Sequence, residues 1–171
     1  MLGDVIDLYD GFLCAATHMG ESEVAERYRS CPRAFTCVLK DEDSGASVCG
    51  YFVLLPLNES GTRAVRGGSV TSGREIRHEY LAGAEAEAVT VYLSVVCGVH
   101  ARARAAAING VIGALRDYYQ RGVRHMFVRA ATTMGSRILQ RLIAVPFGPD
   151  GLIHEVDLAA YTAITMATSR Q

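Results

Sequence analysis

Apolar residues at the start of the chain recur with the spacing of a helix. Between Asp4 and about His18 they predict an amphipathic helix, which Asp4 can cap and Gly20 would end. A second, shorter helix is predicted from about Glu21 to Arg29. The chain is therefore expected to begin with two helices.

The next stretch has the side chains and the turn pattern of strands. Residues 34–40 and 46–55 are rich in strand-forming side chains, and the turn-forming residues 41–45 between them indicate a hairpin. Pro56 is expected to end the second strand, because proline has no amide hydrogen to donate to a sheet.

Residues 57–87 carry no clear period and are interrupted by glycines. One interpretation places a short strand and a turn of helix between Ser69 and Leu81, and a mobile loop is the other. The length of the segment is more typical of a part that covers a substrate than of a linker.

A strand, a helix and a second strand follow in close succession. Residues 88–97 form a near-continuous apolar run, as in strands that are buried on both faces. The helix is expected over about 101–121, where Gly122 ends it, and the second strand covers 123–130. This order predicts two parallel strands joined by a right-handed crossover.

Two more elements complete the pattern. A helix is expected over about 133–144, before Pro146, and a last strand over about 152–160. The predicted fold class is α/β (α+β), with a mixed sheet and helices on both of its faces. With 171 residues, the chain is expected to form a single domain, residues 1–171.

Composition narrows the class of protein. The formal net charge is −1, which argues against a large nucleic-acid-binding surface. No apolar run reaches the ~18 residues that a membrane-spanning helix needs. The first seven residues carry two acids and no base, unlike a secretory signal. A soluble cytoplasmic protein is expected.

Residue types that hold metals or react as nucleophiles form no pattern. The five cysteines are odd in number and include no Cys-x-x-Cys pair, so packing as reduced thiols is expected. The five histidines are scattered, and no metal site is expected. Lys40 is the only lysine beside many arginines, which reflects either codon bias or a use of arginine to grip phosphate.

Three local features carry a resemblance to a known family. The hairpin contains a Gly-aromatic pair at Gly50-Tyr51, and the last predicted helix leads to Pro146-Phe147. A third segment, Arg102-Ala103-Arg104-Ala105-Ala106-Ala107, begins twenty residues before Gly122. With the order of elements, these features resemble the GNAT superfamily of acyl-CoA-dependent acyltransferases over about residues 4–160, less its usual first strand. The family has two glycines where the third segment has alanines, and Gly-Phe at Pro146-Phe147.

The resemblance implies a GNAT-like mixed, mostly antiparallel sheet with a central parallel β-α-β unit. It also implies an acyl-CoA-dependent N-acyltransferase that transfers an acetyl group from acetyl-CoA, or from another acyl-CoA, to an amine by direct attack. The second partner is then an unidentified amine acceptor, with no nucleic acid and no membrane. Sheet-edge strands near either terminus would offer surfaces for a homodimer.

The start of the long helix would hold the phosphates of the cofactor. Amide groups in the first turn of a helix are unpaired, and they bind pyrophosphate together with the positive end of the helix dipole. The residues implied are Arg102, Ala103, Arg104, Ala105, Ala106 and Ala107, with the two arginines adding charged contacts. The alternative is an alanine-rich amphipathic helix whose arginines are only solvated.

The strand before that helix would hold the pantetheine arm, as it does in the family. Carried over, the backbone groups of Leu93, Val95 and Cys97 would pair with the arm, and one of these amides would polarise the thioester carbonyl. Ser136, near the start of the last helix, is a polar contact to the cofactor or, alternatively, part of a helix cap.

Candidates for acid–base chemistry are few. Glu87, just before the strand, would act as a base, directly or through water, although it could equally be a loop charge. Tyr92 and Ser94 share one face of the strand and would contact the substrate. The family's tyrosine acid is replaced by Leu142, which cannot donate a proton. No histidine or acid at a telling spacing supports Cys97 as a nucleophile.

Two other interpretations of the function stay open. The protein could be a catalytically inactive GNAT-fold module that binds acyl-CoA or a protein partner. It could also be an enzyme that uses a longer acyl group or an acyl-carrier protein.

Overall fold

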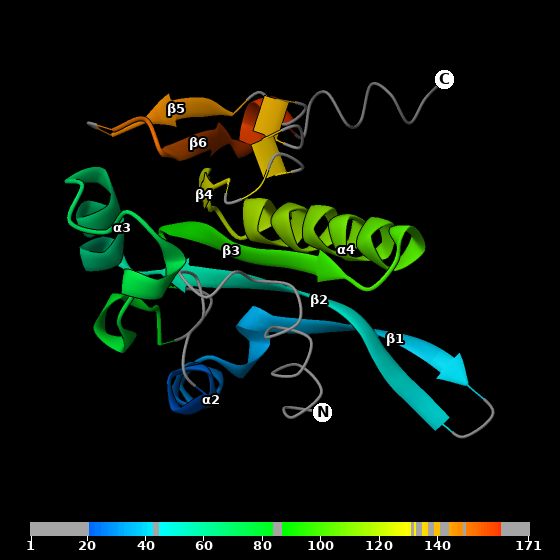
Figure 1. Ribbon diagram of the computed structural model, residues 1–171. Coiled ribbons are helices and arrows are strands. Elements are labelled where there is room, and N and C mark those ends of the chain that lie inside the picture. Colours follow the sequence, from blue (N-terminus) through cyan, green and yellow to red (C-terminus); the bar gives the residue numbers. More distant parts are fainter. Residues whose placement is uncertain are drawn as a thin grey trace. The chain divides into compact units, whose positions relative to one another are not determined.

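A computed structural model describes residues 21–42, 45–83, 87–130, 132, 135–136, 139–140, 144–148 and 150–161. The helical elements are α2 (Glu21–Ser30), α3 (Glu59–Arg66) and α4 (Ala101–Gln120), with short turns η2 (Pro32–Ala34), η3 (Gly73–Glu75) and η4 (His78–Tyr80). The strands are β1 (Phe35–Glu42), β2 (Gly45–Leu57), β3 (Thr90–Gly98), β4 (His125–Arg129), β5 (Val145–Phe147) and β6 (Ile153–Asp157) (Figure 1).

These strands form one mixed sheet in the order β1-β2-β3-β4-β6-β5. The β3–β4 pair is parallel, whereas β1–β2, β4–β6 and β5–β6 are antiparallel. The predicted β-α-β unit is confirmed, because α4 connects the two parallel strands. Gly122 follows α4 with a φ of +101°, a left-handed conformation that glycine adopts without strain and that commonly ends helices.

The described residues divide into two compact units. One contains residues 21–54 and 95–113, and the other contains residues 55–94 and 114–161. The boundaries fall inside β2, β3 and α4, so each of these elements contributes residues to both units.

In the first unit, two glycines allow close contact between backbone segments. A Cβ atom on Gly50 of β2 would lie 2.9 Å from the carbonyl oxygen of Cys97 and 3.2 Å from the Cα atom of Gly98. A Cβ atom on Gly98 would in turn lie 2.6 Å from the amide nitrogen of Arg104 and 2.8 Å from the carbonyl carbon of Ala103. The end of β3 can therefore pack directly against β2 and the start of α4 only because both positions are glycine.

In the second unit, β4 is buried on both faces. Its central residues Met126, Phe127 and Val128 are all in the core, as expected for a strand of a parallel pair. On α3, Asn58 acts as the N-cap, since its side-chain oxygen accepts from the amide of Gly61 at 2.9 Å. The same side chain donates to the carbonyl of Glu79 at 2.8 Å, which ties α3 to η4.

Helix α3 was not predicted, because residues 57–87 lack a long apolar stripe. Its local signals are short: the Asn58 cap and a Glu59–Arg63 ion pair at 3.2 Å with helical i, i+4 spacing. The expectation that Pro56 ends β2 is wrong, because β2 continues to Leu57. Proline lacks only the donor, and the carbonyl of Pro56 accepts from the amide of Ala82 at 3.0 Å.

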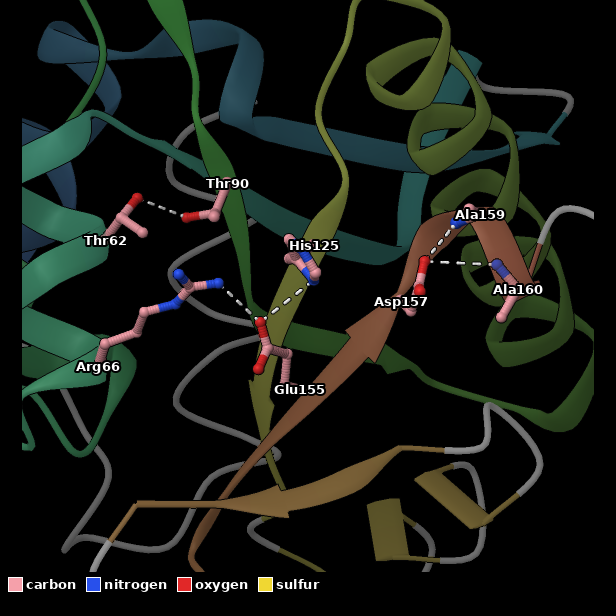
Figure 2. A network of polar contacts seen from close by, with 8 residues as sticks. All are labelled: Thr62, Arg66, Thr90, His125, Glu155, Asp157, Ala159 and Ala160. Carbon is pink, nitrogen blue, oxygen red and sulfur yellow. Dashed lines mark hydrogen bonds and ion pairs between the residues drawn. The ribbon is translucent and has the colours of Figure 1, made fainter.

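The last part of the chain also differs from the prediction. β6 ends at Asp157, and residues 158–161 are helical rather than extended. The Asp157 carboxylate accepts from the amides of Ala159 at 2.8 Å and Ala160 at 3.4 Å, which is an N-cap that starts a helix (Figure 2). The short strand β5 was not predicted, and it pairs with β6 across the Gly148–Gly151 turn.

The remaining elements agree closely with the sequence. α2, β3, α4 and β4 lie within one or two residues of their predicted bounds, and the hairpin strands extend into the predicted turn, to Glu42 and from Gly45. The predicted helix over 4–18 lies outside the described residues. Of the predicted helix over 133–144, the described residues 135–136 and 139–140 are helical. No helix in the described ranges is long and apolar enough to span a membrane.

Candidate functional site

Pairing between β3 and its parallel partner β4 stops halfway along β3, close to the end of β4. The β3–β4 pairs are Val91–Met126, Tyr92–Phe127 and Leu93–Val128, and β3 then continues five residues further to Gly98. Beyond Leu93, no pairing of β3 with β4 is recorded among the described residues. Side chains 94–96 are accordingly half-buried, whereas those of 90–93 are buried. An unpaired strand edge of this kind can form backbone hydrogen bonds with an extended ligand.

The start of α4 is capped by a histidine. The Nδ1 atom of His100 accepts from the amide of Ala103 at 3.0 Å, and its carbonyl accepts from the amide of Arg104 at 3.0 Å. The amides of Ala101 and Arg102 donate no hydrogen bond recorded within the described part of the chain. These two amides therefore lie at the positive end of the helix dipole and have no recorded acceptor in the described part of the chain.

The predicted phosphate-binding residues divide between the first turn and the helix interior. Because α4 already begins at Ala101, the amides of residues 105–107 lie inside the helix, where they bond to carbonyls four residues earlier. Ala103 is only 2% exposed and contacts Gly98, whereas Arg102 is exposed. The Arg104 Nη1 atom donates to the carbonyl of Gly98 at 3.2 Å. The free amides thus lie closer to β3 than the segment 102–107 that the resemblance implied. The cap residue His100 was not predicted, because histidine is not a preferred cap residue.

Cys97, near the end of β3, is buried. Burial raises the pKa of its thiol to about 11, although the backbone and side chain of Tyr51 lower it somewhat. A thiol with a raised pKa stays protonated at neutral pH and is a poor nucleophile. The four cysteines that the structure describes, Cys31, Cys37, Cys49 and Cys97, are all free thiols.

Tyr92 and Ser94 lie under the loop that contains Gly73. The sequence did not predict this contact. A Cβ atom on Gly73 would collide with the Ser94 hydroxyl and lie 3.2 Å from the Tyr92 ring. Tyr92 is 1% exposed, and burial raises the pKa of its hydroxyl well above the ordinary range, with Arg129 and the Gly73 backbone lowering it in part. The hydroxyl of Tyr92 therefore keeps its proton at neutral pH.

Arg129 and Glu75 hold this loop from two sides. The Nη1 atom of Arg129 donates to the carbonyl of Thr71 at 3.1 Å. The Glu75 carboxylate accepts from the Thr71 amide at 2.6 Å, and this bond lowers the pKa of Glu75. Neither residue was a sequence candidate. Arg129 contacts a residue 58 positions away, which its local sequence does not indicate, and Glu75 was missed because residues 57–87 carry no clear period.

Two solved structures share this arrangement of strands and helices. The N-acetyltransferase from Staphylococcus aureus Mu50 superposes with a TM-score of 0.54, and the alignment covers 92% of this chain and 92% of that one at 13% identity. AtaTR bound with AcCoA superposes with a TM-score of 0.51, over 84% of this chain and 81% of that one, also at 13% identity. This chain has the GNAT fold. No protein-family model matches the sequence, and no curated protein does either.

Within the GNAT fold, the two remaining predicted site residues lie in simple surroundings. Glu87 is exposed and precedes β3. The Ser136 hydroxyl donates to the carbonyl of Thr132 at 3.3 Å, while the Thr132 hydroxyl accepts from the amide of Gly135 at 3.0 Å. The cap of this helix start is therefore Thr132, and Ser136 bonds back to the preceding turn. The described residues contain no group of three or more His, Cys, Asp or Glu side chains placed to hold a metal.

A separate ion network joins α3 to the sheet of the GNAT fold. The Glu155 carboxylate lies 3.0 Å from Nη2 of Arg66 and 3.2 Å from Nδ1 of His125 (Figure 2). Arg66 also lies over the ring of Phe127, 5.9 Å from its centre. His125 begins β4, four residues before Arg129, so this network lies roughly 13 Å along the strand from the point where β3 and β4 part. We interpret it as a tether of α3.

Proposed function

We propose that this protein is an acyl-CoA-dependent N-acyltransferase that transfers an acetyl group from acetyl-CoA to an amine. The observation that carries the proposal is that two stretches of backbone with unused hydrogen-bonding groups follow one another along the chain. Among the described residues, β3 has no recorded pairing with β4 from Ser94 to Gly98, and the amides of Ala101 and Arg102, which follow within four residues, have no recorded acceptor. A pantetheine arm followed by a pyrophosphate needs such features in this order.

In this proposal the backbone holds most of the cofactor. Leu93, Val95 and Cys97 would pair with the pantetheine through main-chain groups. The pyrophosphate would accept from the amides of Ala101 and Arg102, and the exposed Arg102 guanidinium would add charge. Support comes from the fold, because one structure that shares it was solved with AcCoA bound.

The proposed reaction is a direct transfer. The amine nitrogen attacks the thioester carbonyl carbon, the C–N bond forms, and the C–S bond breaks. The nitrogen gives one proton to a base and the departing sulfur takes one up, so the products are an amide and the free thiol of CoA. An amide of β3 would stabilise the oxyanion that forms between these events.

The side-chain roles are assigned by protonation state and exposure. Glu87 is exposed and would accept the amine proton through water. Tyr92 keeps its proton because burial raises its pKa, so it would contact the substrate as a neutral hydroxyl, and the departing sulfur would take its proton from water. Ser94, half-buried beside it, would contact the acceptor.

A second candidate is a GNAT-fold module that binds acyl-CoA without turnover. The burial of Tyr92 beneath Gly73 favours it, because the hydroxyl reaches no solvent with the loop in this position. Both candidates share the cofactor site and differ only in chemistry.

Two measurements on the purified protein separate the candidates. Calorimetric titration with acetyl-CoA tests the shared site, and release of free thiol with a panel of amines tests turnover. Binding with amine-dependent thiol release is the result expected. Binding without release for any amine would favour the inactive module, and absence of acetyl-CoA binding would exclude both.

A further inference from the structure

Arg129 occupies the position where β3 and β4 part. The last parallel pair is Leu93–Val128, so Ser94 and Arg129 are the next residue on each strand. Side chains alternate along a strand, and matched residues of neighbouring strands point to the same face. Arg129, Ser94 and Tyr92 therefore share one face of the sheet, beside the predicted reacting centre.

The Arg129 guanidinium is held in place and still has donors to spare. It is exposed, and its recorded hydrogen bond goes to the carbonyl of Thr71. Within the described ranges no carboxylate pairs with it, whereas Arg66 and Arg63 each pair with a glutamate at 3.0 and 3.2 Å. A guanidinium has five N–H donors, and the described residues provide a recorded acceptor for one of those on Arg129.

The acidic side chain of the loop around Gly73, Glu75, already accepts hydrogen bonds. Glu75 accepts from the amide of Thr71 at 2.6 Å and from its hydroxyl, and the lowered pKa keeps it ionised at neutral pH. Thr71 thus bonds Glu75 through its amide and hydroxyl, and Arg129 through its carbonyl. Among the residues that the structure describes, neither Glu75 nor another carboxylate forms a recorded ion pair with Arg129.

A small hollow lies beside Thr71, the residue whose carbonyl Arg129 bonds. It has a volume of about 10 Å³, which is room for one water-sized group, and Thr71 forms part of its wall. Ile153, the cross-strand partner of Arg129, and Phe147, the partner of Ile153, line it as well. The lining of this hollow is largely apolar, with Asp150 as its acidic residue, and the space fits a group the size of a methyl or methylene only.

We infer that Arg129 binds a negatively charged group of the acceptor, so that the acceptor is a small amine carrying a carboxylate or a phosphate. Planar guanidinium groups bind both anions through paired hydrogen bonds. The inference rests on the proposed function, since it assigns the substrate class of that site. Fixing the anion at Arg129 places the amine of a short acceptor next to Ser94, where the acyl group would arrive.

The test uses matched amines and variants of one residue. β-Alanine and phosphoethanolamine carry the charge, and β-alaninamide and ethanolamine are their neutral partners. For the wild type we expect at least about tenfold higher kcat/KM with one charged amine than with its neutral partner. Arg129→Gln should remove this preference by raising KM for the charged amine, and Arg129→Lys should restore part of it. Arg63→Gln, an exposed change on α3, should change nothing.

Two further readouts keep the inference distinct from the proposed function. Acetyl-CoA affinity should be the same in Arg129→Gln and wild type, and a weaker affinity would assign Arg129 to the cofactor and overturn the inference. Binding of the charged amines alone, followed by NMR, should be lost in Arg129→Gln. If acetyl-CoA binds and neutral amines are preferred, only the inference fails. If acetyl-CoA does not bind, the proposed function fails. Comparing β-alanine with phosphoethanolamine identifies which anion is recognised.

Discussion

The start of α4 and the face around Arg129 are built in opposite ways. The parts of the first region all lie between Gly98 and Arg104: the helix cap, the free amides, and the glycine whose missing side chain lets α4 pack against β3. Around Arg129, one hydrogen bond joins residues 58 positions apart, and Tyr92 and Ile153 come from two further segments. The first region is local in sequence and the second exists only in the folded chain.

This difference explains what each region can do. A local site made of backbone amides depends on where a helix begins, and many side chains can be exchanged without changing it. A site made of side chains from distant segments depends on every contact that brings them together. We therefore expect cofactor binding to tolerate substitution, and acceptor choice to be sensitive to it.

The largest effect on the helix start is expected from Gly98→Ala. The new Cβ atom would lie 2.6 Å from the amide nitrogen of Arg104, so β3 and α4 must move apart. We expect a loss of about 1–3 kcal/mol in the free energy of unfolding, measured by urea denaturation. The matched control is Gly113→Ala within α4, where a Cβ atom would meet nothing within 4 Å. That change should add about 0.5–1 kcal/mol of stability. Equal destabilisation by both would refute the close contact.

A smaller effect is expected from removal of the histidine cap. His100→Ala leaves the Ala103 amide without its acceptor, which should lower the free energy of unfolding by about 1 kcal/mol. His100→Asn supplies a common cap residue and should keep most of the stability. If alanine and asparagine behave alike in urea denaturation, the imidazole does not cap α4.

Of these two regions, only the one that is local in sequence, β3 and α4, could be predicted from the sequence. The apolar run of β3, the helix α4 and its end at Gly122 follow from hydrophobic spacing and from glycine, so their bounds could be predicted. Helix α3 could not, because eight residues with a single cap give little periodic signal. Arg129 and Glu75 look like ordinary surface charges in the sequence, and only the β3–β4 register and the Thr71 contacts bring them to the site.

On the Arg129 face, the ion network of Glu155 should matter little for stability. Glu155→Gln weakens the contacts with Arg66 and His125, which are partly exposed, so we expect a loss of about 0.2–1 kcal/mol. Raising the salt concentration should reduce the difference from wild type, because salt screens exposed charges. A loss well above this range in urea denaturation would mean that the contacts of Glu155 contribute substantially to the stability of the protein, which would contradict this expectation.

The smallest effect is expected at Cys97, and it depends on pH. Because burial raises the thiol pKa from 9.0 to about 11, the folded state holds the proton more tightly than the unfolded state. Its contribution to stability is therefore complete below pH 9 and is lost as the pH rises towards 11. Cys97→Ala should lose less stability than wild type between pH 8 and 10.5, and should keep any transferase activity. Inactivation of a folded Cys97→Ala protein would point to a nucleophilic cysteine.

The central claim is that the free amides at the start of α4 bind the cofactor's pyrophosphate. Ala101→Pro removes one of these amides at the helix position where proline is best tolerated, and Ala101→Ser keeps it. A hydrogen bond to a charged group contributes about 1.5–3 kcal/mol, so calorimetric titration of acetyl-CoA should give a Kd about 10–100-fold higher for the proline variant. The serine variant should bind like wild type. If the proline variant, with its helix content intact, binds acetyl-CoA as tightly as wild type, the pyrophosphate does not lie at the start of α4.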